Sequence, residues 1–248
     1  PEEIKRLLDE AGWKTILKAK GGIQVLFGAS PSPMPQNLRD LIAEKAGGAP
    51  IFESDPVMAP MPGKSLFTNT GELASLARER GLSRGEAALA SEAALLGASE
   101  GDLNGEMGLR LDIMLEAVKK GLTGESATMK LLRPFAGSLW NSLADGRFFT
   151  GGPHARAAVR AMAALHECSS GGVVCAAPTG GAAGVLPGVM ATLAEDFGVK
   201  RDGLIRALWA AGAVGYLHDL KSTFAAEVAG CQVEIGAAGA MAAAAVTE

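Results

Sequence analysis

The amino-acid sequence predicts a mainly α protein: an alanine- and glycine-rich multi-helix domain with a small α/β extension at its N-terminus. From Thr70 onward, apolar residues recur at three- and four-residue steps, the spacing of amphipathic helices. The chain has 33 glycines but only 8 phenylalanines, 3 tryptophans and 1 tyrosine. Small aliphatic side chains must therefore pack the core, which favours close contact between helices. The clearest strand pattern lies near the N-terminus.

Residues 1–69 are predicted to form the N-terminal extension and a proline-rich connector. Apolar residues at helical spacing predict a helix over 1–11, and a second helix is expected over 36–46. Residues 23–27, with the sequence I-Q-V-L-F, are a strand candidate. The prolines of 28–35 predict a loop.

The connector is predicted over residues 47–69, where the prolines at 50, 56, 60 and 62 occur. It is the expected domain boundary. Residues 61–64, M-P-G-K, invite comparison with a phosphate-binding loop. They lack the second glycine that a P-loop requires, so this interpretation is rejected.

Residues 70–248 are predicted to form the helical domain. Thr70 is expected to cap a helix that runs to about Arg80, and Ser83-Arg84-Gly85-Glu86 is a capping box that opens the next helix. Asp102 is expected to open a third helix, which ends at Lys119 and Lys120 because basic residues are favoured at a helix C-terminus.

A further helix is predicted from His154 to Cys168, and its expected inward residues are Ala158, Met162 and Leu165. Its two histidines, His154 and His166, lie twelve residues apart rather than four. Helical geometry therefore does not place them in one metal site. Both are predicted to be surface groups.

A glycine-rich turn follows this helix. Pro178-Thr179-Gly180-Gly181 can present its backbone amides as a nest for an anion. A helix is predicted from Gly184 to Phe197, and a helix N-terminus behind glycines suits a substrate carboxylate. Thr179, Gly180 and Gly181 are thus candidate substrate-binding residues. An ordinary tight connector is the alternative.

The last part of the chain contains candidate residues for metal binding and for acid–base chemistry. A helix is predicted from Asp202, as its cap, through Tyr216, and His218 is expected in the loop that follows. Two acidic residues, Glu227 and Glu234, then flank Cys231. A thiol among glycines suits a ligand to a soft metal, although a small buried core residue is the alternative.

The helix after Cys231 is expected to be buried on all sides, because the run from Ile235 to Val246 contains no charged residue. This is the longest uncharged apolar run, and it is shorter than the roughly 18 residues that span a bilayer. The sequence therefore predicts no membrane segment.

The charge balance and the cysteine count exclude further classes. There are 23 basic and 27 acidic residues, so no polycationic surface for nucleic acid is expected. Three cysteines, an odd number, and no signal peptide predict reduced thiols and a cytoplasmic location.

Three motifs resemble a known family. Residues 230–244 read G-C-Q-V-E-I-G, then M-A-A-A; residues 176–187 read A-A-P-T-G-G, then G-V-L-P; and residues 207–215 read A-L-W-A-A-G-A-V-G. Together they resemble the alpha domain of the iron–sulfur L-serine dehydratases, in the family's order and at family-like spacing. The resemblance covers roughly residues 155–248.

The resemblance implies a lyase that deaminates L-serine, or a similar small β-substituted amino acid, to pyruvate and ammonia. Such enzymes use a [4Fe–4S] cluster held by three protein thiolates, and not pyridoxal phosphate. The remaining iron is a Lewis acid for the substrate hydroxyl. Cys231 matches one cluster ligand. Glu227 and Glu234 are candidates for the general base by position only.

Two assignments of the cluster ligands compete. In the first, Cys168, Cys175 and Cys231 bind the cluster together. In the second, only Cys231 is a ligand. The resemblance supports the second, because the family's other two thiols belong to a later C-D-P…V-P-C segment. We therefore expect the remaining ligands beyond Glu248 and a chain that is incomplete at its C-terminus.

The resemblance also implies a partner and some departures from the family. A beta domain or beta chain is expected to complete the active site, in an oligomer. Residues 133–141 keep only part of the family's S-G-L-x-G-G pattern, and Ser138 and Asn141 are expected to cap helices. The serine of an S-G-A-E box is replaced near Phe224, while Glu227 is kept.

Two other functions remain open from the sequence. An L-cysteine desulfidase of the same superfamily would explain the missing serine, because soft iron also binds sulfur. A catalytically silent helical subunit that only binds a partner would explain why a single matching thiol is present.

Overall fold

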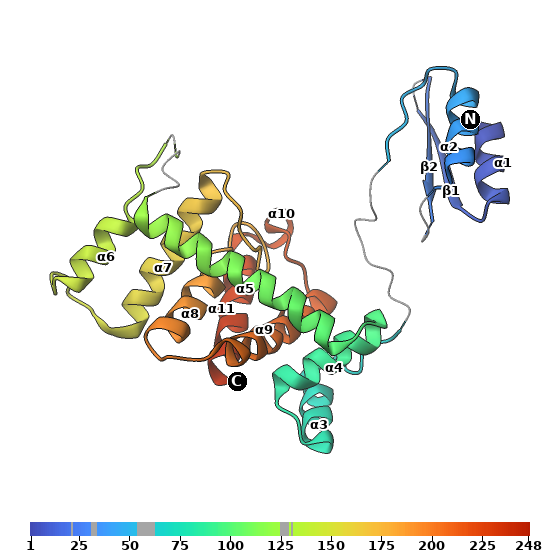
Figure 1. Cartoon of the computed structure of the whole chain (residues 1–248). Coiled ribbons are helices and arrows are strands. Elements are labelled where there is room, and N and C mark those ends of the chain that lie inside the picture. The colour runs from blue at the N-terminus through green and yellow to red at the C-terminus, as the bar shows by residue number, and fades with distance from the viewer. Residues whose placement is uncertain (21, 31–33, 54–62, 125–128, 130) are drawn as a thin grey trace. The chain divides into compact units, whose positions relative to one another are not determined.

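A computed structural model describes residues 1–20, 22–30, 34–53, 63–124, 129 and 131–248. The chain forms two compact units, Pro1–Pro60 and Met61–Glu248 (Figure 1). Part of the predicted connector lies outside the described residues, so the exact boundary at residues 69 and 70 stays a prediction.

The described residues of the N-terminal unit form two helices and one β-hairpin. Its elements are α1 (Glu2–Glu10), β1 (Lys14–Lys20), β2 (Ile23–Ala29) and α2 (Gln36–Ala46). The strands pair antiparallel, with Leu17 opposite Leu26. Strand β1 was not predicted, because the adjacent Ile16 and Leu17 break the alternation of polar and apolar residues that marks a strand. Strand β2 extends two residues beyond the predicted 23–27.

The helical unit confirms the predicted mainly α fold class. Its elements are α3 (Thr70–Arg80), α4 (Arg84–Leu96), α5 (Glu100–Thr123), α6 (Ala136–Ala144), α7 (Gly152–Ser169), α8 (Val185–Glu195), α9 (Arg201–Lys221), α10 (Ala226–Ala229) and α11 (Cys231–Thr247). Helix α6 was not predicted. None of the described helices is long and apolar enough to cross a bilayer.

The helix starts show which capping predictions hold. Ser83 and Glu86 form the predicted capping box of α4. Asn69, rather than Thr70, caps α3 through its side chain. Ser99 caps α5, so Asp102 lies inside the first turn and does not open the helix. Each correction moves the cap one or a few residues upstream, to a side chain that accepts from a free amide.

Two further capping predictions were wrong. Lys200 is the N-cap residue of α9, and no side chain caps that helix. The helix also continues to Lys221, so His218 is helical and not in a loop. In α6, the Ser138 hydroxyl donates to the Phe135 carbonyl from within the helix instead of capping it.

The core of the helical unit lies where α5, α8, α9 and α11 meet. Its buried side chains include Leu111, Leu186, Met190, Leu208 and Met241. Figure 1 shows the long α5 (green) running across α7, α8 and α9, and α5 packs on all three. Burial of each large aliphatic side chain contributes about 1.5–3 kcal/mol.

Glycines allow the helix backbones to touch. A Cβ atom on Gly121 of α5 would lie only 1.9 Å from the Ala163 carbonyl oxygen of α7. A Cβ atom on Gly188 of α8 would lie 2.6 Å from the Ala157 carbonyl oxygen, also on α7. Helix α7 is therefore clamped between α5 and α8 at distances that only glycine permits.

The inward face of α7 differs from the predicted one. Met162 is 38% exposed, whereas Val159, Ala163 and Ala164 are buried. The prediction was wrong because it assumed that only apolar residues face inward, whereas the charged Arg160 lies on the buried side of α7.

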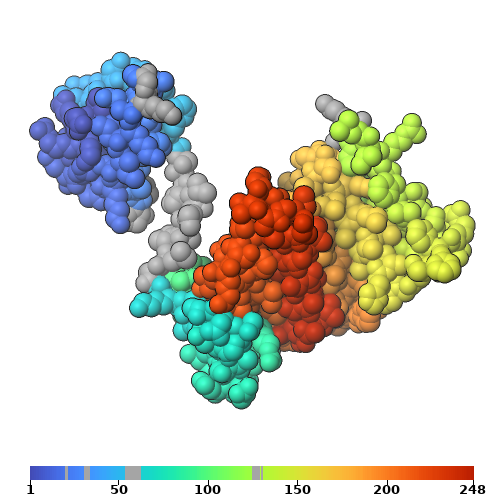
Figure 2. Space-filling view, turned by 180° about the vertical axis from the view of Figure 1, so that it is seen from behind, coloured from blue at the N-terminus to red at the C-terminus, as the bar shows by residue number. Residues whose placement is uncertain are grey.

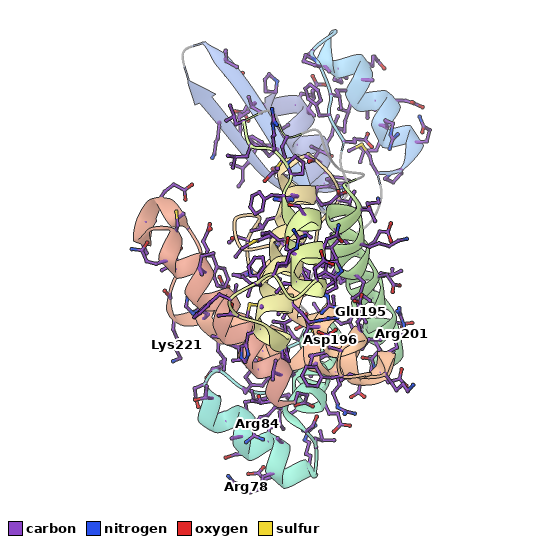
Figure 3. The ribbon with its side chains drawn as sticks, turned by 90° about the vertical axis from the view of Figure 1, so that its left-hand side faces the viewer. Arg78, Arg84, Glu195, Asp196, Arg201 and Lys221 are labelled. Atoms are coloured by element: carbon purple, nitrogen blue, oxygen red, sulfur yellow. The ribbon has the colours of Figure 1, made fainter. Side chains whose placement is uncertain are left out.

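Arg160 is fully buried and held by charge and by an aromatic ring. Its Nη1 donates to Thr192 Oγ1 at 2.8 Å and to Asp196 Oδ2 at 3.0 Å. Arg156 also binds Asp196, and the Trp140 ring lies 4.6 Å from the Arg160 guanidinium carbon. Figure 3 labels Asp196 at the end of α8. A buried cation requires such partners, and they tie α6 and α7 to α8.

Helix α11 is not buried on all sides, which corrects the prediction. It packs on α9 and α8 through Ala238, Met241, Ala242 and Ala245. Ile235 is 50% exposed and Val246 58% exposed. Figure 2 shows α11, in deep red, forming part of the surface of the helical unit. The uncharged sequence therefore did not reveal which face is covered.

We expect Gly121→Ala to destabilise the helical unit by about 1–3 kcal/mol or more, because the new methyl group overlaps the Ala163 carbonyl. Gly105→Ala, on the same helix, is the matched control. A Cβ atom there meets nothing within 4 Å, so this change should stabilise by up to about 1 kcal/mol. Urea unfolding measures both; equal effects would contradict the close contact.

Candidate active site

The predicted substrate turn and the first turn of α11 meet in the structure. The Glu234 carboxylate lies against Gly181, and a Cβ atom on Gly181 would be 2.3 Å from Glu234 Oε2. Glu234 is half-buried and Gly181 is exposed. The two segments are more than fifty residues apart in sequence, so the fold has brought a carboxylate and a glycine turn together.

Backbone hydrogen bonds and close packing shape the turn. The Thr179 carbonyl accepts from Ala182 N, and the Gly180 carbonyl accepts from Ala183 N, both at 3.3 Å. Gly184 then leads into α8, and a Cβ atom there would be 2.3 Å from the Ala161 carbonyl oxygen of α7. The turn is therefore anchored to α7 at its exit and directly precedes the α8 N-terminus.

The side chain of Thr179 in this turn carries a buried hydroxyl group. Its Oγ1 is buried and has no hydrogen-bond partner among the described residues. A buried hydroxyl without a partner costs about 1–3 kcal/mol. A ligand that hydrogen-bonds to Thr179 would remove that cost, so this residue fits its predicted place in a substrate site.

Cys231 is the first residue of α11 and is exposed. Gly230 precedes it with φ +81°, a conformation that favours glycine. The N-terminal end of a helix stabilises negative charge, and the thiolate is the form of cysteine that binds metal. Cys231 is therefore accessible and positioned for a ligand role rather than buried as a core residue.

The other two thiols lie in different surroundings. The Cys168 Sγ donates to the Gly180 carbonyl at 3.6 Å, which places it beside the substrate turn. Cys175 packs partly buried against the main core, and that burial raises the pKa of its thiol. No local sequence pattern predicts this position for Cys168, because the contact depends on how α7 ends.

The described residues do not complete a metal site by themselves. Within the part of the chain that the structure describes, no group of three or more histidine, cysteine or acidic side chains could hold a metal ion. A four-iron cluster normally takes three or four cysteines. Among the described residues, Cys168, Cys175 and Cys231 therefore do not form such a set.

The two candidate bases have different positions. Glu234 contacts the turn, as described above. Glu227 is exposed on the one-turn helix α10 and forms no hydrogen bond or ion pair with the described residues. The structure therefore brings Glu234 to the candidate site and shows no contact that does so for Glu227.

Phe224, near the position of the family's serine, stacks on His218. The two rings are parallel within 9° and their centroids are 5.3 Å apart. His218 Nε2 is buried without a hydrogen-bond partner among the described residues. The stack fixes the segment between α9 and α10. The stack was not predicted, because His218 was expected in a loop, whereas it lies within α9.

The two histidines of α7 also differ from each other. His154 is exposed, as predicted, but the prediction for His166 was wrong, because it is only 6% exposed. The His166 ring meets Phe135 edge-on at 4.8 Å. Its burial lowers the pKa of the imidazole. His166 is therefore a neutral packing group near neutral pH.

These features define a helical domain with a glycine-rich turn, an adjacent carboxylate and an exposed thiol. The sequence model of the family described as serine dehydratase alpha chain matches residues 79–248. The chain therefore belongs to the serine dehydratase alpha chain family.

Curated relatives agree with this assignment. A protein of Bacillus subtilis named probable L-serine dehydratase, alpha chain, is 31% identical over 183 residues, covering 74% of this chain and 61% of the relative. An L-serine dehydratase of Streptomyces coelicolor is 32% identical over 84% of this chain and 45% of the relative. The L-serine dehydratase alpha chain of Peptoniphilus asaccharolyticus is 28% identical over 74% of this chain and 63% of the relative. The chain thus spans less than two thirds of each relative.

We expect the pH dependence of stability to change in His166→Gln. Below about pH 6.5 the unfolded chain binds a proton on His166, whereas the folded chain binds it only at lower pH. The unfolded state then holds more protons, so wild-type stability falls as the pH falls through this range. Urea unfolding at several pH values should show a shallower fall in the variant.

His154→Gln is the matched control, because His154 is exposed on the same helix. It should keep the wild-type pH dependence. An unchanged slope in His166→Gln would contradict the burial of a neutral imidazole at this position.

Proposed function

We propose that this chain is the alpha part of an L-serine dehydratase, a lyase that converts L-serine to pyruvate and ammonia. The proposal rests on the contact between Gly181 and the Glu234 carboxylate in a chain of the serine dehydratase alpha chain family. The exposed Cys231 precedes Glu234 by three residues on the same helix. Substrates with a carboxylate and an acidic α-proton need an anion-receiving turn and a base close together.

The residues of the turn would bind the substrate carboxylate. Gly180 and Gly181 have no side chains to block their amides, and the α8 N-terminus adds a favourable dipole. The Thr179 hydroxyl supplies a donor that has no internal partner. Glu234, against Gly181, would then take the α-proton of the bound amino acid.

We propose that Cys231 is one thiolate ligand of a [4Fe–4S] cluster. When bound, such a cluster would supply a Lewis acid for the substrate's leaving hydroxyl. Cys231 is exposed and lies at a helix N-terminus, and both properties support its role as a ligand. We propose that the other ligands are supplied from outside the described residues.

The open position of Cys231 supports a partner at the site. Two of the relatives above are named alpha chains. We propose that a beta chain or beta domain covers Cys231 and completes the site in an oligomer, in the cytoplasm, where thiols stay reduced.

An L-cysteine desulfidase is the second candidate. The Phe224–His218 stack favours it, because an apolar ring occupies the region in which the family has a serine hydroxyl. A cysteine substrate would present a soft sulfur atom, which suits an iron–sulfur site if one is bound. Release of pyruvate from L-serine and from L-cysteine distinguishes the two enzymes, and release from neither favours a silent partner subunit.

We expect Cys231→Ser to abolish the absorbance near 400 nm that anaerobic reconstitution with iron and sulfide should produce. The experiment uses this chain with its natural flanking sequence and partner. Cys175→Ser, which alters a core-facing thiol, is the control and should retain the absorbance. Loss in the control but not in Cys231→Ser would contradict the ligand assignment.

We expect Glu234→Gln to lower kcat by about 100-fold or more, the usual range for loss of a general base. Glu227→Gln, at an exposed position, should change kcat little. Gly181→Ala should also impair activity, because its methyl group would displace the Glu234 carboxylate. Steady-state assays of pyruvate release measure all three; a larger effect in Glu227→Gln would reverse the assignment.

A further inference from the structure

The N-terminal unit leaves one face of its sheet uncovered. Lys14, Ile16 and Lys18 of β1 lie on the same side as Ala29, Phe27 and Val25, their partners on β2. We call this side the outer sheet face; its exposed side chains are Lys14, Ile16, Lys18, Ile23, Val25 and Phe27. Ile16 is 60% exposed, Phe27 55% and Ile23 69%.

The helices of the unit cover the opposite face. A Cβ atom on Gly28 would meet Leu8 of α1 at 3.1 Å and Trp13 at 3.3 Å. Gly28 pairs with Thr15, whose hydroxyl bonds to Asp9 of α1. In Figure 1, α1 and α2 lie on the same side of the hairpin. The outer sheet face therefore has no cover from the described residues of its own unit.

The N-terminal unit buries few apolar side chains while its outer sheet face is uncovered. Leu8 and Ile42 are its buried apolar side chains among the described residues. A two-stranded sheet is marginal in water. Covering Ile16, Val25 and Phe27 would bury more large apolar side chains than the unit now buries. A contiguous exposed apolar patch of this kind marks an interaction surface.

The charges specify the chemistry of the occupant. In the helices, Lys5 pairs with Asp9, Arg6 with Glu10, and Lys45 with Glu3. Lys14 and Lys18 on the outer sheet face form no ion pair with the described side chains, and neither strand contains an acidic residue. An occupant with an apolar centre and acidic edges would pair these lysines while it covers the apolar residues.

The dimensions fit one helix. Seven residues of strand extend about 23 Å at 3.3 Å per residue, which matches about fifteen residues of helix at 1.5 Å each. A second copy of the same face would bring lysines toward lysines. An anionic membrane would gain only about 1 kcal/mol per lysine. Both are therefore poorer occupants than a protein helix.

We propose that the outer sheet face docks an amphipathic helix of a partner protein whose apolar stripe is flanked by aspartate or glutamate. Phe27, Ile16 and Val25 contact the apolar stripe, and Lys14 and Lys18 pair with the acidic flanks. The proposal is independent of the lyase activity, because it rests on the N-terminal unit alone.

The test uses the full chain and two synthetic 18-residue helical peptides. Both have leucines at i, i+3, i+4 and i+7; one has glutamates flanking the stripe and the other has lysines. Fluorescence anisotropy gives the affinities, and amide chemical shifts locate the binding. We expect the acidic peptide to bind at least tenfold more tightly, with shifts in β1 and β2.

The double variant Lys14→Glu/Lys18→Glu should reverse this preference by at least tenfold. Lys64→Glu/Lys200→Glu, which changes the same net charge at exposed lysines of the helical unit, is the matched control and should behave as wild type. Circular dichroism checks that each variant folds.

Several outcomes would overturn the proposal. The first is equal affinity for the two peptides. The second is chemical-shift changes outside the hairpin. The third is a double variant that binds the acidic peptide with wild-type affinity. Tighter binding to phosphatidylserine vesicles than to the acidic peptide would favour a membrane instead. Self-association lost in the double variant would favour a second copy.

Discussion

Backbone contact between helices is the constraint on which the helical unit depends. With few aromatic side chains, the unit cannot fill wide gaps between helices, so the helices approach until their backbones touch. Gly121 and Gly188 permit this on two sides of α7, and Gly184 does the same where the substrate turn ends. The close contacts make α7 a rigid support, and Arg160 with Asp196 fixes its place against α8.

The position of the candidate site follows from that support. Because Gly184 holds the start of α8 on α7, the preceding turn has little freedom to move. Helix α11 packs on α8 and α9, and Glu234 in its first turn contacts Gly181 of that turn. The site therefore combines a turn fixed by its own neighbours with a helix end that stays exposed. Such an arrangement suits a site that a second chain completes.

The N-terminal unit differs from the helical unit in how much apolar surface it buries. Among its described residues only Leu8 and Ile42 are buried apolar side chains, and Lys14 and Lys18 on the outer sheet face form no ion pair with described side chains. The exposed faces of the two units differ in chemistry. The open face of α11 has mostly small, uncharged side chains, whereas the outer sheet face has large apolar side chains and lysines.

Local patterns in the sequence determined the mainly α fold class, the capping box at Ser83 and Glu86, and the family, because these depend on residues close together in the chain. They also marked Thr179 to Gly181 and Cys231 as functional candidates. Only the tertiary structure decided that Glu234, and not Glu227, contacts the turn, that His166 is buried, and that α11 has an open face. These outcomes depend on which helices pack together, and an almost uniform alanine–glycine pattern does not specify one face over another.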